Sequence, residues 1–179
     1  MVYAALLRGI NVGGNNKVEM ARLKHTFESV GFENVKTYIN SGNIIFTDES
    51  RPKGDIETLI EQGILRDFKL SIKVLVRDLP AMQKLNTEIP SKWQNDTLQR
   101  TDVMFLWDDV DSPEIVKSIP AKPDIETIKY VRGAVLWNIG RKNVKRGAVV
   151  RIIGSDIYRK MTIRNVNTVR KLLELMQSV

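Results

Sequence analysis

The sequence predicts an α/β (α+β) protein made of two ferredoxin-like halves, each a βαββαβ unit with a trailing helix. Short β-rich runs alternate with runs of helical periodicity, and the same order of runs occurs twice along the chain. The 179 residues are also enough for two small domains with buried cores. We expect a first half at residues 1–90 and a second, basic half at residues 91–179 that ends in a helix.

The first half begins with a β-rich run that leads into a glycine-rich loop. Apolar residues at three- and four-residue spacings then predict a helix that stops before Gly31. Turn residues Asn40, Ser41 and Gly42 separate two β-rich runs, which indicates a hairpin. The expected elements are a strand at 3–8, a helix at 18–30, hairpin strands at 35–39 and 43–47, a helix at 53–68, a strand at 71–76 and a helix from 78.

The second half repeats this order after a polar linker at residues 86–100. Its hairpin turns at Arg132 and Gly133, and its last helix has an apolar face. The expected elements are a strand at 102–107, a helix at 113–119, hairpin strands at 125–131 and 134–139, a helix at 142–153, a strand at 158–163 and a helix at 165–176.

The composition excludes several classes of site. There is no cysteine, so the chain has no disulfide, iron–sulfur cluster, thiolate zinc site or cysteine nucleophile. His25 is the only histidine, so no pair of histidines can hold a metal. No apolar run approaches the roughly 18 residues that cross a bilayer. We therefore expect a cytoplasmic protein with no cofactor, no metal and no membrane partner.

The positive charge is concentrated in the last third of the chain. Residues 122–179 carry 13 Lys and Arg against 4 Asp and Glu, whereas residues 1–121 carry 15 against 17. Clustered cations attract phosphate esters, nucleic acids and acidic protein surfaces. The alternative is a solvated basic face that only aids solubility.

Residues 8–17 form the first of three polar blocks and lie between a strand and a helix. Gly13 and Gly14 allow the backbone to approach an anion and present N–H groups to it, with Lys17 nearby as a countercharge. The block matches neither a Walker loop nor the G-x-G-x-x-G pattern. The alternative is a tight turn followed by a capping box of Asn16 and Glu19.

The second block, residues 37–43, gathers hydroxyl, amide and glycine groups at a hairpin tip, and its alternative is a turn with no further role. The third block, residues 161–168, lies at a strand-to-helix junction. There Arg164 has the geometry to grip a carboxylate or phosphate, and Asn165 or Thr168 caps the last helix. Because the helix dipole disfavours a cation at an N-terminus, Arg164 is the strongest single functional candidate.

We expect the three blocks to converge on a cleft between the halves that binds a small anionic or phosphorylated ligand. The predicted ligand-binding residues are Arg8, Asn11, Gly13, Gly14, Lys17, Ser41, Asn43, Arg164 and Asn165. No pair of nucleophile and base is recognisable, so whether the protein is an enzyme stays open and no residue has a catalytic role. The sequence does not indicate an oligomeric state.

Two alternatives have no small ligand: binding of nucleic acid or an acidic protein through the basic third, and an interaction protein without a ligand. Nucleic acid is not favoured, because the RNA-recognition pattern that starts at Arg132 loses its stacking aromatic residues after Gly133. A cluster of acidic residues is expected to cap a helix rather than bind a cation. That cluster is Asp108, Asp109, Asp111 and Glu114.

Three stretches, LLRGINVGG at residues 6–14, TYINSGN at 37–43 and TIRNVNTV at 162–169, resemble the bacterial family named domain of unknown function 1697. The resemblance implies a chain of about this length with two related α/β halves, no established activity and no accepted catalytic residues. Val166 stands where the family usually has Trp. That change implies weaker stacking on a ligand if the ring lines a pocket, or a smaller core residue if the ring is packed.

Overall fold

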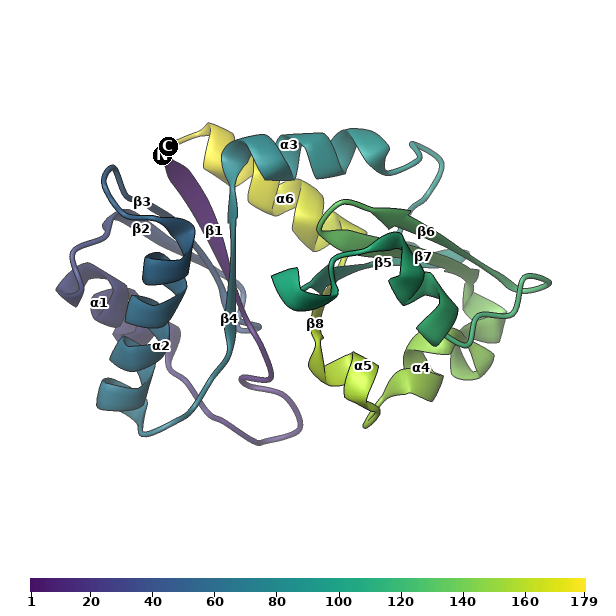
Figure 1. Cartoon of the computed structure of the whole chain (residues 1–179), viewed down its shortest axis with the longest axis horizontal. Coiled ribbons are helices and arrows are strands. Elements are labelled where there is room, and N and C mark those ends of the chain that lie inside the picture. The colour runs from purple at the N-terminus through teal and green to yellow at the C-terminus, as the bar shows by residue number, and fades with distance from the viewer. The chain divides into compact units, whose positions relative to one another are not determined.

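The computed structural model describes residues 1–179 and contains two four-stranded antiparallel sheets, each with helices (Figure 1). The first four strands form one sheet and the last four form the other, so the predicted α/β class with two halves is confirmed. The chain divides into two compact units, Met1–Met82 with Leu172–Val179 and Gln83–Lys171. The sequence placed the boundary between residues 90 and 91.

The first unit follows the order strand, helix, hairpin, helix, strand. Its sheet has the order β2-β3-β1-β4, and the central strand β1 pairs Leu6 with Asn43 of β3 and Ala5 with Val76 of β4. Helices α1 and α2 lie on one face of this sheet (Figure 1). The elements are β1 (Val2–Leu7), α1 (Met20–Ser29), β2 (Glu33–Tyr38), β3 (Asn43–Thr47), α2 (Lys53–Phe68) and β4 (Val74–Asp78).

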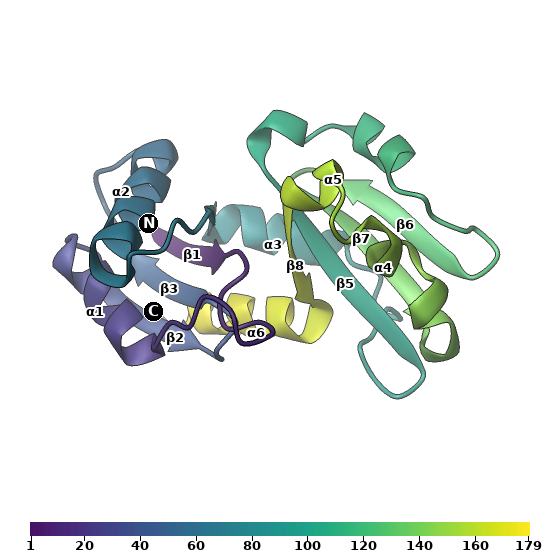
Figure 2. The same ribbon diagram turned by 90° about the horizontal axis from the view of Figure 1, so that it is seen from below.

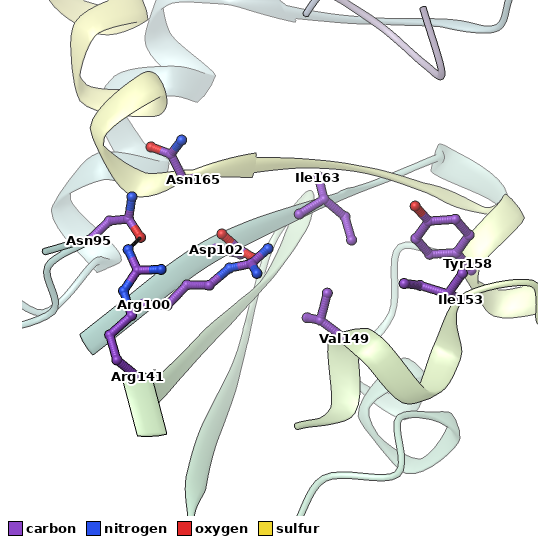
Figure 3. Close-up of a pocket in the computed structure, with 9 residues that line it drawn as sticks. All are labelled: Asn95, Arg100, Asp102, Arg141, Val149, Ile153, Tyr158, Ile163 and Asn165. Carbon is purple, nitrogen blue, oxygen red and sulfur yellow. Dashed lines mark hydrogen bonds and ion pairs between the residues drawn. The ribbon is translucent and has the colours of Figure 1, made fainter. Parts of the chain in front are cut away.

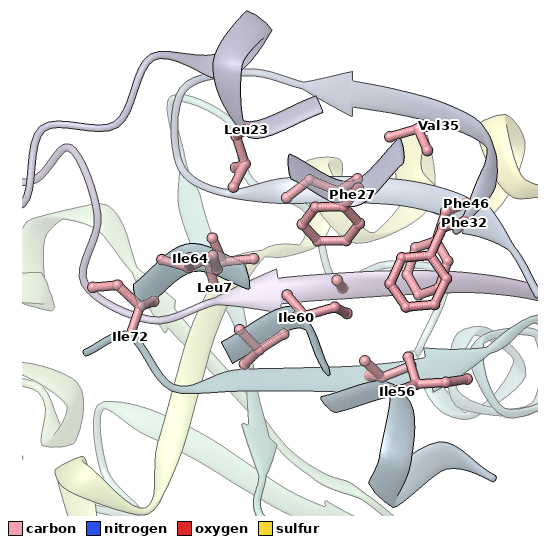
Figure 4. Packing of buried hydrophobic residues seen from close by; sticks show 14 of the residues in the cluster. Leu7, Leu23, Phe27, Phe32, Val35, Phe46, Ile56, Ile60, Ile64 and Ile72 are labelled. Atoms are coloured by element: carbon pink, nitrogen blue, oxygen red, sulfur yellow. The ribbon is translucent and has the colours of Figure 1, made fainter. Parts of the chain in front are cut away.

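Aromatic and aliphatic side chains fill the space between these helices and the sheet (Figure 4). The ring centroids of Phe27, Phe32 and Phe46 lie 4.5 to 5.8 Å apart, and α2 contributes the fully buried Ile56 and Ile60. The sequence spacing that predicted these helices is therefore the spacing of the side chains that they bury.

The second unit repeats the strand order, as β6-β7-β5-β8 (Figure 2). Two trailing helices, α3 (Leu79–Glu88) and α6 (Val166–Gln177), follow β4 and β8. The other elements are β5 (Gln99–Leu106), η1 (Asp108–Val110), η2 (Pro113–Ser118), β6 (Glu126–Val131), β7 (Ala134–Gly140), η3 (Arg141–Arg146), α4 (Ala148–Ile152), α5 (Asp156–Arg159) and β8 (Met161–Asn165).

The register of β5 against β8 decides which side chains share a face of the second sheet. Asp102 pairs with Asn165 and Met104 pairs with Ile163, so these four residues lie on one face. Arg164 pairs with Val103 and lies on the opposite face. Arg164 and Asn165 are neighbours in the sequence but lie on opposite faces of the sheet.

Three of the predicted elements in the second half differ from the structure. The helix expected at 113–119 is a 3₁₀ helix, and the strand expected at 158–163 starts only at Met161 because Asp156–Arg159 form α5. The helix expected at 142–153 is split into η3 and α4 at Gly147, whose backbone is extended. A Cβ at Gly147 would lie 2.6 Å from Cζ2 of the buried Trp137, so this glycine allows the close approach of α4 to β7. No helix is both long and apolar enough to cross a membrane.

Candidate functional site

A pocket of about 420 Å³ opens in the second unit (Figure 3). It lies on the face of the sheet that carries Asp102 and Asn165, beside α4 and α5. Charged and amide side chains occupy one end and apolar side chains the other. The lining residues are Asn95, Arg100, Asp102, Arg141, Val149, Ile153, Tyr158, Ile163 and Asn165.

Arg141 follows β7 directly and is held by the turn that precedes β5. Its Nε donates to the carbonyl oxygen of Asp96 at 2.7 Å, and its Nη2 donates to Oδ1 of Asn95 at 3.0 Å. Its backbone N–H donates to the carbonyl oxygen of Leu98 at 2.9 Å. Nη1 has no hydrogen-bond partner and the guanidinium forms no ion pair. The guanidinium is therefore fixed in position without an ion pair, although its charge interacts with the nearby carboxylates of Asp96 and Asp102.

Arg100 and Asp102 form an ion pair beside Arg141. Nε of Arg100 donates to Oδ2 of Asp102 at 2.9 Å, Nη2 lies 2.7 Å from the same oxygen, and the guanidinium lies 5.6 Å from the ring centroid of Trp137. Burial raises the pKa of Asp102, and the hydrogen bond from Arg100 opposes that shift. Asp102 is 1% exposed, and its Oδ1 accepts no hydrogen bond from the protein.

Two carboxamides complete the polar end. Asn95 is fixed on both sides, because its backbone oxygen accepts from Asn167 Nδ2 at 2.9 Å and its Oδ1 accepts from Arg141. Oδ1 of Asn165 accepts from the backbone N–H of Thr168 at 3.0 Å, which caps α6 as the sequence predicted. In both residues the Nδ2 group has no protein partner. Together with Nη1 of Arg141, these three residues carry three unused donor groups.

The first two predicted blocks lie together in the first unit. Asn11, at φ 53°, donates through Nδ2 to the carbonyl oxygens of Asn40 at 2.8 Å and Val18 at 2.9 Å, and its Oδ1 accepts from the Val18 N–H at 2.8 Å. Leu7 N–H donates to the Gly42 oxygen. Asn11 therefore ties the glycine loop to the hairpin tip.

The other predicted residues of the first unit divide into buried and exposed ones. Asn43 is fully buried and donates to the Tyr38 oxygen and to Oγ of Ser41, inside the hairpin. Gly13 and Gly14 have positive φ and, like Lys17, are exposed. Arg8 follows β1 and donates its backbone N–H to the Lys73 oxygen.

The predicted capping box is wrong. Helix α1 begins at Met20, and Glu19 makes no side-chain capping bond. Asn16 instead donates to the Gly9 oxygen at 2.9 Å, within the glycine loop. Asn11 and Asn16 satisfy backbone groups of the loop itself, so Asn16 is not available to cap the helix.

Arg164 is only 8% exposed and does not line the pocket. Its Nη1 donates to Oγ1 of Thr162 at 3.0 Å and to the Ile163 oxygen at 2.9 Å. Burial lowers the pKa of Arg164 to about 10. Of the nine predicted residues, Asn165 is the one that lines this pocket. The cleft expected between the halves stays a prediction.

Sequence reasoning missed Asn95, Arg100, Asp102, Arg141 and Tyr158. Asn95 and Arg100 fell in the stretch taken as a polar linker, and Arg141 was one of many cations in the basic third. Asp102 carried a usable signal, because it is in phase with Met104 and Leu106 on an apolar strand. A charged residue at such a core-facing position indicates a buried partner or a site.

Two other candidates have structural roles. Oδ1 of Asp111 accepts from the Tyr130 hydroxyl at 2.9 Å and from the Gly133 N–H at 2.8 Å, so it holds the β6–β7 turn. No side chain makes a capping hydrogen bond at the start of η1 or η2, so the capping expected of the acidic cluster is wrong. Trp137 is fully buried and donates to Oε2 of Glu126 at 2.5 Å. No group of three or more His, Asp or Glu side chains is arranged to hold a metal ion.

The chain is thus an α/β protein with two antiparallel sheets of the same strand order. A partly apolar pocket lies on the second sheet. The family model described as protein of unknown function (DUF1697) matches residues 1–137, and the chain belongs to this family. It is similar to the solved structure of the conserved bacterial protein SP0830 from Streptococcus pneumoniae, with 28% sequence identity and a TM-score of 0.84 over 98% of each chain. Comparison with curated proteins finds no match.

Proposed function

We propose that this protein binds a small anionic ligand in the pocket of its second half. The observation that carries the proposal is Arg141, whose guanidinium lines the pocket, is fixed by two side-chain hydrogen bonds and forms no ion pair. Because this guanidinium is already held in place, little side-chain entropy is lost when an anion binds to it. Its unused edge can donate charge-assisted hydrogen bonds to the anion. Asn95 and Asn165 add two neutral donors at the same end.

Binding of simple anions to the full chain tests this function. Isothermal titration with acetate, inorganic phosphate and sulfate is expected to give saturable heat for at least one of them, and Arg141→Gln is expected to weaken that binding at least tenfold. Arg132→Gln is the matched control, since Arg132 is an exposed arginine of the same unit that does not line the pocket. Absence of binding, or equal binding by the Arg141 variant, would remove the proposal.

The residues predicted from the sequence in the first half form a separate candidate for anion contact. Gly13 and Gly14 expose their backbone, and Lys17 makes no hydrogen bond or ion pair. The expectation that Arg164 grips the ligand belongs to the same hypothesis. Titrations of Lys17→Gln and Arg164→Ala separate the two sites: if these variants lose anion binding and Arg141→Gln does not, the ligand belongs to the predicted blocks.

The second candidate function is polyanion binding by the basic third of the chain. Its support is the run of exposed cations in η3, namely Lys142, Lys145 and Arg146, which lie next to the pocket residue Arg141. This site needs no cavity, because phosphates on a nucleic acid or carboxylates on an acidic protein contact such a surface from outside.

We also propose a bacterial cytoplasmic location and an origin of the two halves by duplication of a ferredoxin-like unit. The absence of cysteine is typical of proteins from a reducing compartment, and the similar protein SP0830 is bacterial. The shared strand order of the two sheets supports duplication. Cell fractionation of a tagged full-length chain tests the location, and recovery with the membrane fraction after a salt wash would contradict it.

A further inference from the structure

The pocket has a second end whose side chains are aliphatic. Val149 and Ile153 come from the α4 region and Ile163 comes from β8, and they lie opposite the polar end together with the ring of Tyr158 (Figure 3). Ile153 is 60% exposed although it borders a pocket. An apolar surface of this kind is stabilised when a ligand removes it from water.

The charges at the polar end match a single negative charge on the ligand. Arg100 is paired with Asp102, so that pair contributes no net charge, and Arg141, which forms no ion pair, gives the lining residues a net charge of +1. A carboxylate carries one charge, whereas a phosphate monoester carries close to two near neutral pH. A monocarboxylate therefore suits this end better than a phosphate ester.

Asp102 restricts which ligands can bind next to the anion site. Asp102 lines the pocket and is 1% exposed, and its Oδ1 accepts no hydrogen bond from the protein. Asp102 is paired directly with Asn165 in the sheet, so Oδ1 and the free Nδ2 of Asn165 belong to neighbouring side chains. A carboxylate bound by Asn165 would repel Asp102 unless the ligand places a donor close to its carboxylate.

We propose that the ligand is a 2-hydroxy acid with an apolar chain, whose carboxylate contacts Arg141, Asn95 and Asn165 and whose hydroxyl donates to Asp102. The apolar chain packs on Val149, Ile153 and Ile163. An ammonium donor is less suited than a hydroxyl, because Arg100 already neutralises Asp102 and a zwitterion leaves Arg141 without a net countercharge. The inference rests on the proposed function, since it concerns the same pocket and the same anion contact.

Titration of the full chain with acids of one carbon skeleton tests the inference. The reference is 2-hydroxy-4-methylpentanoate, and each comparison changes one feature: 4-methylpentanoate lacks the hydroxyl, lactate lacks most of the chain, leucine has an ammonium group in place of the hydroxyl, and 4-methylpentane-1,2-diol has a hydroxymethyl group in place of the carboxylate. We expect the reference to bind best. Loss of the hydroxyl is expected to weaken binding about fivefold, and each lost carbon about fourfold.

The outcomes separate this inference from the proposed function. If lactate binds as well as the reference, or 4-methylpentanoate binds as well or better, the ligand class is wrong while anion binding stands. Tighter binding of leucine than of the reference would contradict two claims: that a hydroxyl donates to Asp102, and that the polar end suits a ligand with a net negative charge. If 4-methylpentane-1,2-diol binds as well as the reference, or if no acid binds and Arg141→Gln leaves the binding of acetate, phosphate and sulfate unchanged, the proposed function itself fails.

One pair of variants tests the apolar end without disturbing the core. Ile153→Ser is expected to weaken binding of 2-hydroxy-4-methylpentanoate several-fold and to leave lactate binding unchanged, because only the longer acid reaches this side chain. Leu65→Ser is the control, since Leu65 is 51% exposed, lies in the first unit and does not line the pocket. Equal effects of the two variants on the longer acid would contradict the placement of the chain.

Discussion

At the scale of single residues, most polar side chains of the predicted blocks satisfy backbone groups of their own unit. Asn11 is the clearest case, since its amide joins the glycine loop to the hairpin tip through three hydrogen bonds. Asn43 and Asn16 serve the same purpose inside the hairpin and the loop. An irregular segment needs such partners because its N–H and C=O groups lack a regular ladder. A block rich in Asn and Gly is therefore no evidence of a ligand by itself.

Asn11→Ala is expected to destabilise the protein by about 2–4 kcal/mol. The variant loses three hydrogen bonds, and these bonds also support the positive φ, which alanine adopts less readily than asparagine. Urea unfolding measures the difference. Asn15→Ala is the control, because the side chain of Asn15 is exposed and makes no hydrogen bond. Similar midpoints for the two variants would show that the Asn11 contacts do not support the loop.

Asp67 is expected to contribute to the acid sensitivity of the protein. The hydrogen bonds from Arg66 at 2.6 Å and from the Thr26 hydroxyl at 2.7 Å hold the pKa of Asp67 well below its usual range. Because the folded-state pKa is lowered, the stabilisation is present above the unfolded-state value near 4 and is lost as the pH falls below it. Unfolding free energies between pH 6 and about pH 2 measure this loss.

Asp67→Asn is expected to lower stability at neutral pH and to flatten this part of the pH profile. Asp124→Asn serves as the control, since Asp124 is exposed and its carboxylate makes no hydrogen bond. A profile of the Asp67 variant parallel to that of the wild type would contradict the assignment.

At the scale of elements, buried polar groups decide how the second unit deviates from a simple repeat. The carboxylate of Glu126 accepts hydrogen bonds from Trp137 Nε1, from the Ala148 N–H and from the Lys122 N–H. It therefore joins β6, β7 and the first turn of α4. The chain stays extended at Gly147 so that α4 can approach Trp137, which is why one expected helix became two short ones.

Gly147→Ala is expected to destabilise the protein by about 1–3 kcal/mol. The new Cβ would lie 2.6 Å from Cζ2 of Trp137 and 2.9 Å from Cδ1 of Ile139, and both side chains are buried in the core. Thermal unfolding compares this variant with Gly54→Ala in the first turn of α2, where a Cβ meets nothing within 4 Å. The control is expected to be neutral or slightly stabilising, because alanine favours a helix over glycine. An unchanged melting temperature for the Gly147 variant would show that the α4 region is loosely packed.

At the scale of the whole molecule, the net charge of +7 and its concentration in residues 122–179 bear on the choice between the two candidate functions. A pocket with one uncompensated charge and an apolar wall responds weakly to salt. A surface that contacts several phosphates releases several counterions, so its affinity falls steeply with salt concentration.

Fluorescence titration with a short labelled RNA at increasing salt separates these cases. If polyanion binding by the η3 cations is the function, we expect affinity to fall by powers of ten between low and physiological salt. Replacing Lys142, Lys145 and Arg146 together by Gln is expected to reduce the slope of log affinity against log salt concentration by about three. Weak binding that does not depend on salt, or the same slope in the triple variant, would contradict this alternative.

The sequence by itself determined the order of the elements, the two halves and the cores. Hydrophobic periodicity is a local signal, and in these segments burial follows it, as Phe27 and Ile60 illustrate. The tertiary structure alone decided the pocket, whose residues come from positions 95 to 165 and meet because β5 pairs with β8 in one register. Side chains alternate between the faces of a strand, so that register placed Asn165 in the pocket and its neighbour Arg164 on the other face.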